Sequence, residues 1–183
     1  MRQLIKFSLF DAGNSVFPML VLSALTSSYF VNHIVADEQL GTALWQLTIG
    51  IAGIFIAFVM PYIGNVADNM INGRLKLLRL FTFLCILFVG CFYFILPNQE
   101  YVLTALVILF LGSVTYEASN SLYNSIMKNC STSNLTLSSG IGFGTGFLGG
   151  VLILVLLLYT LILPQPNLFG ISMDNYLHLR FAH

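Results

Sequence analysis

Residues 42–64 read TALWQLTIGIAGIFIAFVMPYIG and contain no charged side chain. A helix needs about 20 residues to cross a hydrocarbon core of roughly 30 Å, so this run is long enough to span a membrane. In lipid, every backbone polar group has to be satisfied within the segment, which a helix achieves by itself. The run also lacks the alternation typical of membrane β-barrel strands. We therefore predict that this stretch is a transmembrane helix.

Four more apolar runs of similar length lie on either side of this stretch. The fourth helix in chain order is interrupted by a single charge, Glu117. Glycine, proline, asparagine and charged residues, which favour turns, separate the runs. The predicted fold class is all-α integral membrane with about five transmembrane helices, in one half-domain over residues 1–163 and a short non-cytoplasmic tail over 164–183. The other predicted helices cover residues 12–36, 80–96, 101–127 and 139–163.

The composition excludes several other classes of protein. Of the 183 residues, 57% are hydrophobic and 8% are charged, whereas soluble domains carry roughly 25% charged residues. The formal net charge is zero, which gives no reason to expect nucleic-acid binding. The three cysteines show no metal or redox spacing, and no serine–histidine or paired-aspartate arrangement is visible. We predict a protein of the lipid bilayer that is not an enzyme and has no metal site or cofactor.

The basic residues are distributed unequally between the two ends of the predicted helices. Six of the seven lie on the side of the N-terminus, and one lies on the other side. Cytoplasmic loops carry the excess of lysine and arginine, so the N-terminus is expected in the cytoplasm. The expected location is the inner cell membrane or, in a eukaryote, the vacuolar membrane. The six are Arg2, Lys6, Arg74, Lys76, Arg79 and Lys128, and the seventh is Arg180.

A polar stripe follows one face of the fourth predicted helix. At about 100° per residue, five polar side chains fall within one arc of roughly 100°. A carboxylate in hydrocarbon costs about 2.5–3.5 kcal/mol and marks a cavity or a partner. The stripe is either a substrate or proton path, or a polar contact in which Glu117 bonds to Asn14 or a tyrosine. Its members are Ser113, Glu117, Asn120, Ser121 and Asn124.

The first predicted helix begins with a similar polar face made of Asp11, Asn14, Ser15 and Pro18. Aspartate at a helix start can satisfy free N–H groups, so Asp11 is either an N-cap or part of the path. Asn14 lies one turn deeper, where a cap cannot account for it. We therefore count Asn14 among the candidate path residues.

The fifth predicted helix is rich in glycine. Gly142, Gly146 and Gly149 share one face, and Gly140 and Gly144 occupy the opposite face. Small residues spaced in this way allow helix backbones to approach closely in membranes. We predict that this helix packs between two neighbours.

The loop after residue 64 contains a recognisable arrangement of residues. Gly64 is followed by Asp68 and then by the pair Gly73 and Arg74. A charged cytoplasmic turn is one interpretation. The arrangement also resembles the G-x-x-x-D-x-x-G-R-[KR] signature of the major facilitator superfamily, with the Gly-Arg pair two residues later than usual.

Three further segments resemble one branch of this superfamily, typified by the vacuolar amino-acid effluxers of autophagy and their bacterial relatives. Residues 11–17, DAGNSVF, resemble its D-W-A-N-S-x-F opening, with Gly13 in place of tryptophan. Residues 139–150, SGIGFGTGFLGG, resemble its S-G-x-G-x-x-x-G-Y-x-G-G segment, with Phe147 in place of tyrosine. Residues 123–125, YNS, resemble an F-Y-N-[AS] element. The four segments occur in the family's order along nearly the whole chain.

The resemblance implies a twelve-helix fold in two halves, of which this chain covers the first without its sixth helix. It implies efflux or uptake of a small solute, with amino acids as one candidate class, by alternating access between this half and a C-terminal half or a second copy. The alternative is a non-transporting remnant or a membrane interaction subunit. The implied substrate path comprises Asp11, Asn14, Glu117, Asn120 and Asn124. The implied cytoplasmic gate comprises Gly64, Asp68, Gly73 and Arg74.

Overall fold

The structure, a computed structural model, describes residues 10–130, 135–164, 169–171 and 174–180. Within these ranges every regular element is a helix, and none is a strand. Five helices are long and apolar enough to cross a membrane, which confirms the predicted fold class. They are the first helix (Phe10–Val35), α3 (Glu38–Asn69), α4 (Gly73–Cys91) extended by η3 (Phe92–Phe94), α5 (Val102–Cys130) preceded by η4 (Gln99–Tyr101), and α6 (Leu135–Leu157) extended by η5 (Leu158–Ile162).

The helices are longer than the uncharged runs that predicted them. The helix predicted over 42–64 begins at Glu38, because the Asp37 side chain caps it by accepting a hydrogen bond of 2.9 Å from the backbone N–H of Leu40. The helix predicted over 80–96 begins at Gly73. Its first turns carry the basic residues that we had assigned to the loop, since a charged side chain at a membrane surface is compatible with a helix.

The first helix departs from regular α geometry along much of its length. It contains π-helical segments η1 (Phe17–Ala24) and η2 (Phe30–Val35), separated by the short α2 (Leu25–Tyr29). Pro18 stands at the start of η1, where proline supplies no backbone N–H. The hydroxyl of Ser23 donates a hydrogen bond of 2.9 Å to the carbonyl of Pro18. Ala24, the last residue of η1, has backbone angles outside the helical range.

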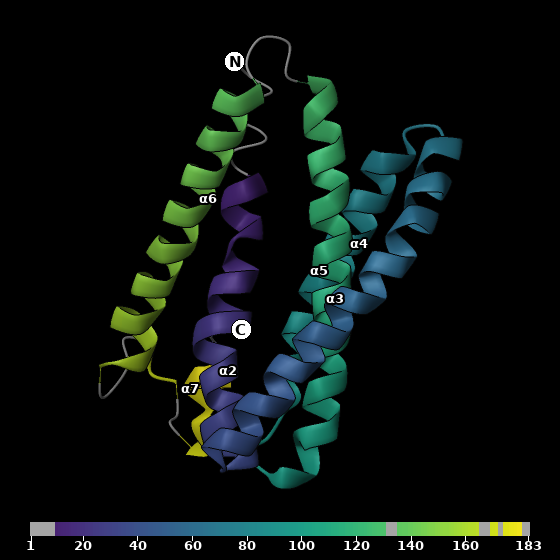
Figure 1. Ribbon diagram of the computed structural model, residues 1–183. Coiled ribbons are helices and arrows are strands. Elements are labelled where there is room, and N and C mark those ends of the chain that lie inside the picture. Colours follow the sequence, from purple (N-terminus) through teal and green to yellow (C-terminus); the bar gives the residue numbers. More distant parts are fainter. Residues whose placement is uncertain (1–9, 131–134, 165–168, 172–173, 181–183) are drawn as a thin grey trace.

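The main core lies in the part of the bundle that contains α2. There the second half of the first helix packs against α3, α5 and η3, around the fully buried Trp45. The indole N–H of Trp45 donates to the Leu22 carbonyl at 3.2 Å, and the hydroxyl of Tyr29 donates to the Ile95 carbonyl at 2.9 Å. Figure 1 shows α3, α4 and α5 grouped together, with the first helix and α6 side by side next to them.

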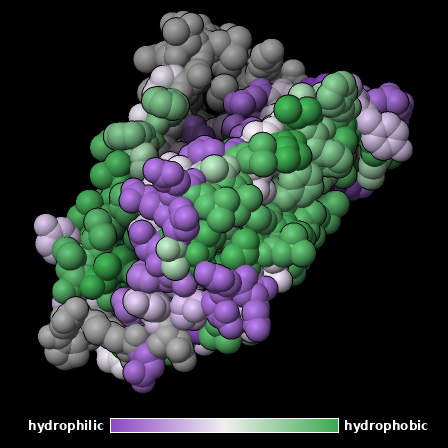
Figure 2. All heavy atoms as spheres, turned by 60° about the horizontal axis from the view of Figure 1, so that its bottom comes forward, coloured by the Kyte–Doolittle hydropathy of each residue, from purple (hydrophilic) through white to green (hydrophobic). Residues whose placement is uncertain are grey.

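The outer surface is strongly apolar. Phe58 on α3 and Phe143 on α6 are 81% and 76% exposed. Figure 2 shows hydrophobic residues over much of the side of the molecule, with hydrophilic residues gathered on the end that faces the viewer. An exposed apolar area of this extent marks an interaction surface, and on a bundle of membrane-spanning helices it is the surface that contacts lipid.

The described tail segments lie against the end of the bundle that contains α2 (Figure 1). They form η6 (Asp174–Tyr176) and α7 (Leu177–Arg180). Two guanidinium nitrogens of Arg180 donate to the carbonyl of Tyr93, one of them at 2.8 Å, and the guanidinium lies over the ring of the same tyrosine. The ring of Tyr176 stacks on His33 with a centroid distance of 3.9 Å.

Candidate functional site

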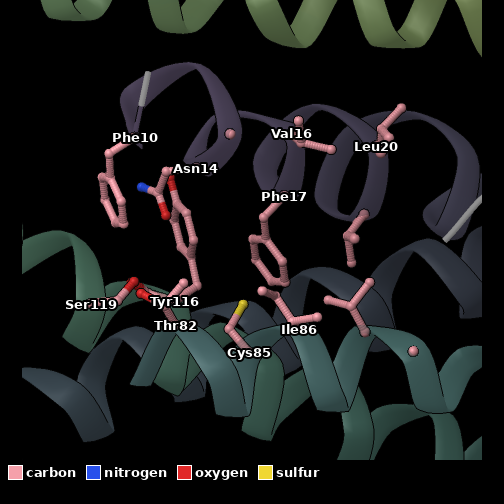
Figure 3. A pocket seen from close by; sticks show the side chains of 14 residues that line it. Phe10, Asn14, Val16, Phe17, Leu20, Thr82, Cys85, Ile86, Tyr116 and Ser119 are labelled. Carbon is pink, nitrogen blue, oxygen red and sulfur yellow. The ribbon is translucent and has the colours of Figure 1, made fainter. Parts of the chain in front are cut away.

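A cavity of about 570 Å³ lies between the first helix, α4 and α5. Figure 3 shows the first helix along one wall and α4 and α5 along the other. Volumes of 300–1,000 Å³ are typical of small-molecule sites. Its lining consists of Phe10, Gly13, Asn14, Val16, Phe17, Leu20 and Val21 from the first helix, Thr82, Cys85, Ile86, Val89 and Gly90 from α4, and Tyr116 and Ser119 from α5.

The polar groups of the cavity gather at one end. Figure 3 shows Asn14, Tyr116, Ser119 and Thr82 there. The hydroxyl of Thr82 donates to the Leu78 carbonyl and that of Ser119 to the Tyr116 carbonyl, both at 2.8 Å. Their oxygens can therefore only accept further hydrogen bonds. Within the described part of the chain, the Asn14 amide and the Tyr116 hydroxyl make no hydrogen bond, so both are available to a ligand.

The other end of the cavity is apolar. Phe17 of the first helix stacks on Tyr116 of α5 with a centroid distance of 4.6 Å and forms the border between the two ends. Beyond it lies Leu20, whereas the thiol-bearing Cys85 lies between Thr82 and Ile86 (Figure 3). None of the described residues that line the cavity is charged.

The structure brings one of the five predicted path residues, Asn14, to this cavity. Glu117 and Asn120 are half-buried and Asn124 is exposed, on a face of α5 that does not line the cavity. The carboxylate of Glu117 makes no hydrogen bond or ion pair within the described residues. The alternative to a substrate path was a polar contact between Glu117 and Asn14 or a tyrosine. This contact is therefore not formed among the described residues.

Asp11, the fifth predicted path residue, lies at a junction of three helices. Residue 10 is already helical, so Asp11 stands inside the helix instead of capping its start. Its carboxylate accepts a hydrogen bond from the hydroxyl of Tyr123 on α5. Phe10 stacks on the same tyrosine with a centroid distance of 4.8 Å. On the other side Asp11 faces Gly142 of α6.

The glycine face of α6 lies against the first helix. A Cβ on Gly146 would lie 2.6 Å from the Ser15 hydroxyl oxygen, and a Cβ on Gly149 would lie 2.9 Å from the Cβ of Ala12. No described atom lies within 4 Å of such a Cβ on Gly140 or Gly144. The prediction of two neighbours was therefore wrong for the described residues: close packing occurs on one side, and the opposite glycines face open space.

The four predicted gate residues lie around the turn between α3 and α4. Arg74 pairs with Asp68 through a 2.8 Å hydrogen bond from Nε to a carboxylate oxygen, and both side chains are exposed. A Cβ on Gly73 would overlap the carbonyl oxygen of Ala67 and lie 2.7 Å from the Cβ of Met70. Gly64 has no described neighbour within 4 Å of such a Cβ. Only glycine fits at residue 73, and the tight turn there brings Arg74 back to Asp68.

Sequence reasoning missed several residues that line the cavity or form the junction. Tyr116, Ser119 and Thr82 lie on helix faces that no polar periodicity distinguishes from ordinary core positions. Tyr123 appeared only as part of a motif. One signal for a partner of Asp11 was present in the sequence, namely that Tyr123 is a tyrosine on the same helix as Glu117.

These features define a class of protein: a multi-pass helical membrane protein. A family model described as "Vacuole effluxer Atg22 like" matches residues 29–129, which is more than half of the chain. The chain belongs to this family of membrane transporters. A search of curated proteins and a search of solved structures each gave no match. The matched range includes Asp68, Arg74 and Glu117, whereas Asp11, Asn14 and the glycines of α6 lie outside it.

Proposed function

We propose that this chain forms one half of a secondary transporter that moves a small solute across the membrane by alternating access. Family membership supports transport as the activity. The observation that carries the proposal for this chain is the half-buried Glu117, which stands in a membrane-spanning helix without a hydrogen-bonding partner among the described residues. A carboxylate at such depth is costly and is retained where it serves a solute or proton path.

The path runs along α5 past Glu117, Asn120 and Asn124, with Asn14 and Asp11 on the facing helix. In transporters built from two halves, the site lies where the halves meet. The residues on this face of α5 are half-buried to exposed. Such a face is expected where a C-terminal half or a second copy covers the surface. Amino acids are the first class of solute to test, since the family is described as one of vacuole effluxers.

The turn between α3 and α4 acts as the gate on the cytoplasmic side. The pair of Asp68 and Arg74 is exposed, so water weakens it and it adds little to the stability of the fold. An exposed pair held in place by a tight glycine turn is well suited to exchange partners when the two halves move. The inner cell membrane or a vacuolar membrane is the proposed location, with the N-terminus in the cytoplasm.

The test is uptake and efflux of a labelled amino-acid mixture in vesicles that contain the protein together with its second half or second copy. Glu117→Gln should reduce coupled flux at least tenfold while the protein remains inserted and folded. Glu100→Gln is the matched control, because Glu100 is an exposed carboxylate in η4, at the very start of the fourth candidate membrane span. Unchanged flux in folded Glu117→Gln would remove Glu117 from the path. Absence of any flux in every assembly would favour the non-transporting interaction subunit.

A further inference from the structure

The cavity between the first helix, α4 and α5 shares Asn14 with the proposed path, but Glu117, Asn120 and Asn124 do not line it. We propose that it binds an uncharged, single-chain amphiphile that carries a hydroxyl head, such as a long-chain alcohol or a monoacylglycerol. The inference goes beyond the proposed function, and it holds or fails independently of transport.

The polar end of the cavity matches a hydroxyl group. The Asn14 amide can donate and accept, and the hydroxyl oxygens of Ser119 and Thr82 can only accept because their hydrogens are already bound to backbone carbonyls. A ligand hydroxyl can donate to one of these oxygens and accept from Asn14 or Tyr116. Polar groups left unpaired in a water-poor cavity are costly, so such a ligand would satisfy groups that the protein alone leaves open.

The apolar end of the cavity matches a hydrocarbon chain. Phe17, Leu20 and Val89 offer only apolar contacts there. A hydrocarbon chain that moves from the bilayer into such surroundings exchanges one apolar environment for another, so it enters without a desolvation cost. The volume of about 570 Å³ is far larger than a head group alone would require.

The absence of charge among the described lining residues makes ions and zwitterions poor ligands for the cavity. No described residue of the lining is charged, and burial of an ion without a charged partner is strongly unfavourable. A free amino acid or a fatty-acid anion would therefore bind poorly. This property distinguishes the cavity from the path that contains Glu117.

The cavity opens sideways, toward the hydrocarbon of the membrane. Ile86 borders it and is 65% exposed, and two further lining residues, Gly90 of α4 and Gly13 of the first helix, are also exposed. All three lie within predicted membrane spans. A molecule dissolved in the bilayer can therefore enter between the first helix and α4 without crossing water.

The experiment uses the full chain in lipid nanodiscs and a long-chain alcohol that carries a photoreactive diazirine. Labelling should concentrate on the cavity residues of the first helix and α4. Unlabelled alcohol should compete, whereas leucine and a fatty-acid anion should not. Gly90→Phe should reduce labelling at least tenfold, because a Cβ there meets no described atom within 4 Å and the ring can fill the opening. Gly53→Phe is the matched control, an exposed glycine on α3 with equally open surroundings that does not line the cavity.

The head-group assignment is tested by Asn14→Leu, which should weaken competition by the alcohol roughly fivefold and leave competition by an alkane of equal length unchanged. Should a variant fail to fold, Cys85 in the Cys91→Ser/Cys130→Ser background provides a second measurement. The alcohol should slow maleimide labelling of this thiol, which lines the cavity. Labelling spread evenly over lipid-facing residues, equal labelling in Gly90→Phe, or competition by leucine would each overturn the proposal.

Discussion

The carboxylate of Asp11 lies in the space that a side chain at Gly142 would occupy: a Cβ there would be 2.6 Å from the Asp11 Oδ2 atom. The two residues lie far apart in the sequence and belong to different helices. The same carboxylate binds the hydroxyl of Tyr123 on α5. The glycine thus allows a polar side chain to link three membrane-spanning helices.

The first prediction concerns the close approach of α6 to the first helix. Gly146→Leu should destabilise the fold by about 1–3 kcal/mol, because the new side chain must displace Ser15 or the Asp11 backbone. Gly144→Leu adds the same side chain where no described atom lies within 4 Å, so it should change little. Thermal unfolding in detergent, followed by size-exclusion chromatography, measures both. Equal stability of the two variants would mean that the two faces of α6 are equivalent.

The second prediction concerns the hydrogen bond between Asp11 and Tyr123. Tyr123→Phe keeps the stack on Phe10 but removes the hydroxyl, and should cost about 1 kcal/mol. Asp11→Ala should be less harmful in the Tyr123→Phe background than in the parent, since the bond is already lost. A double-mutant cycle of unfolding free energies gives the coupling. A coupling energy of zero would show that the two groups do not depend on each other.

The third prediction concerns the turn before α4. Gly73→Ala should destabilise the protein, because a Cβ would overlap the Ala67 carbonyl oxygen. Gly64→Ala should be neutral or stabilising by up to about 1 kcal/mol, since it replaces glycine by alanine inside α3 in open surroundings. The unfolding midpoints of the Gly73→Ala and Gly64→Ala variants, compared with that of the parent, measure both effects. A Gly73→Ala variant as stable as Gly64→Ala would contradict the tight turn.

The fourth prediction concerns orientation. In a background without native cysteines, Asn72→Cys should be labelled by an impermeant reagent only from the cytoplasmic side, and Asp37→Cys only from the opposite side. The reason is the excess of lysine and arginine at the end that includes the N-terminus and the turn before α4. External labelling of position 72 would reverse the assignment.

The fifth prediction concerns pH and the docked tail. Burial lowers the pKa of the His178 imidazole, so the docked tail holds a proton less readily than a free tail. Docking should therefore be tightest above pH about 6.5 and should weaken as the pH falls from that value through the lower pKa of the docked state. His33, which interacts with His178, and Arg180 are the neighbouring basic groups. Asp174 is the acidic residue of the tail.

Hydrogen exchange of residues 174–180, corrected for the intrinsic rate, measures this effect at pH 7.5 and pH 5. Exchange should be faster at pH 5 in the parent. The double variant His33→Phe/His178→Phe retains an aromatic ring beneath Tyr176 and should show nearly equal protection at both values. Equal protection in the parent would show that the histidines do not control docking.

The fold was largely predictable because the physical signal was strong. An uncharged run longer than about 20 residues has few alternatives to a membrane helix. The helix ends were less predictable, since the charges of Arg74 and Lys76 appeared to mark a loop although they lie on the first turns of α4. The residue composition predicted a turn at Gly73. Only the structure shows that a Cβ at this position would overlap the Ala67 carbonyl oxygen.

The candidate site was predicted only in part. Periodicity shows which residues share a face of one helix, as with Glu117, Asn120 and Asn124. It does not show how far that helix is rotated toward its neighbours. The cavity therefore contains Asn14 from the predicted set together with Tyr116 and Ser119, which belong to another face of α5. For the same reason, spacing could not show that Gly140 and Gly144 face open space.

The irregular first helix has a mechanical consequence. Its hydrogen bonds change to the wider π pattern on both sides of α2, and the backbone leaves the helical range at Ala24. Ala12 and Ser15, before Ala24, contact α6, whereas the core around Trp45 contains Tyr29 and Phe30 from the part after Ala24 and extends back only as far as Phe17. Bending stiffness should therefore be lowest near Ala24, so that the first turns of this helix can tilt together with α6. Distances between spin labels on α6 and α5 should be broadly distributed in the parent protein. Replacing Pro18 by alanine should restore a regular, stiffer helix and therefore narrow the distance distribution. An unchanged width would mean that the first helix does not bend near Ala24.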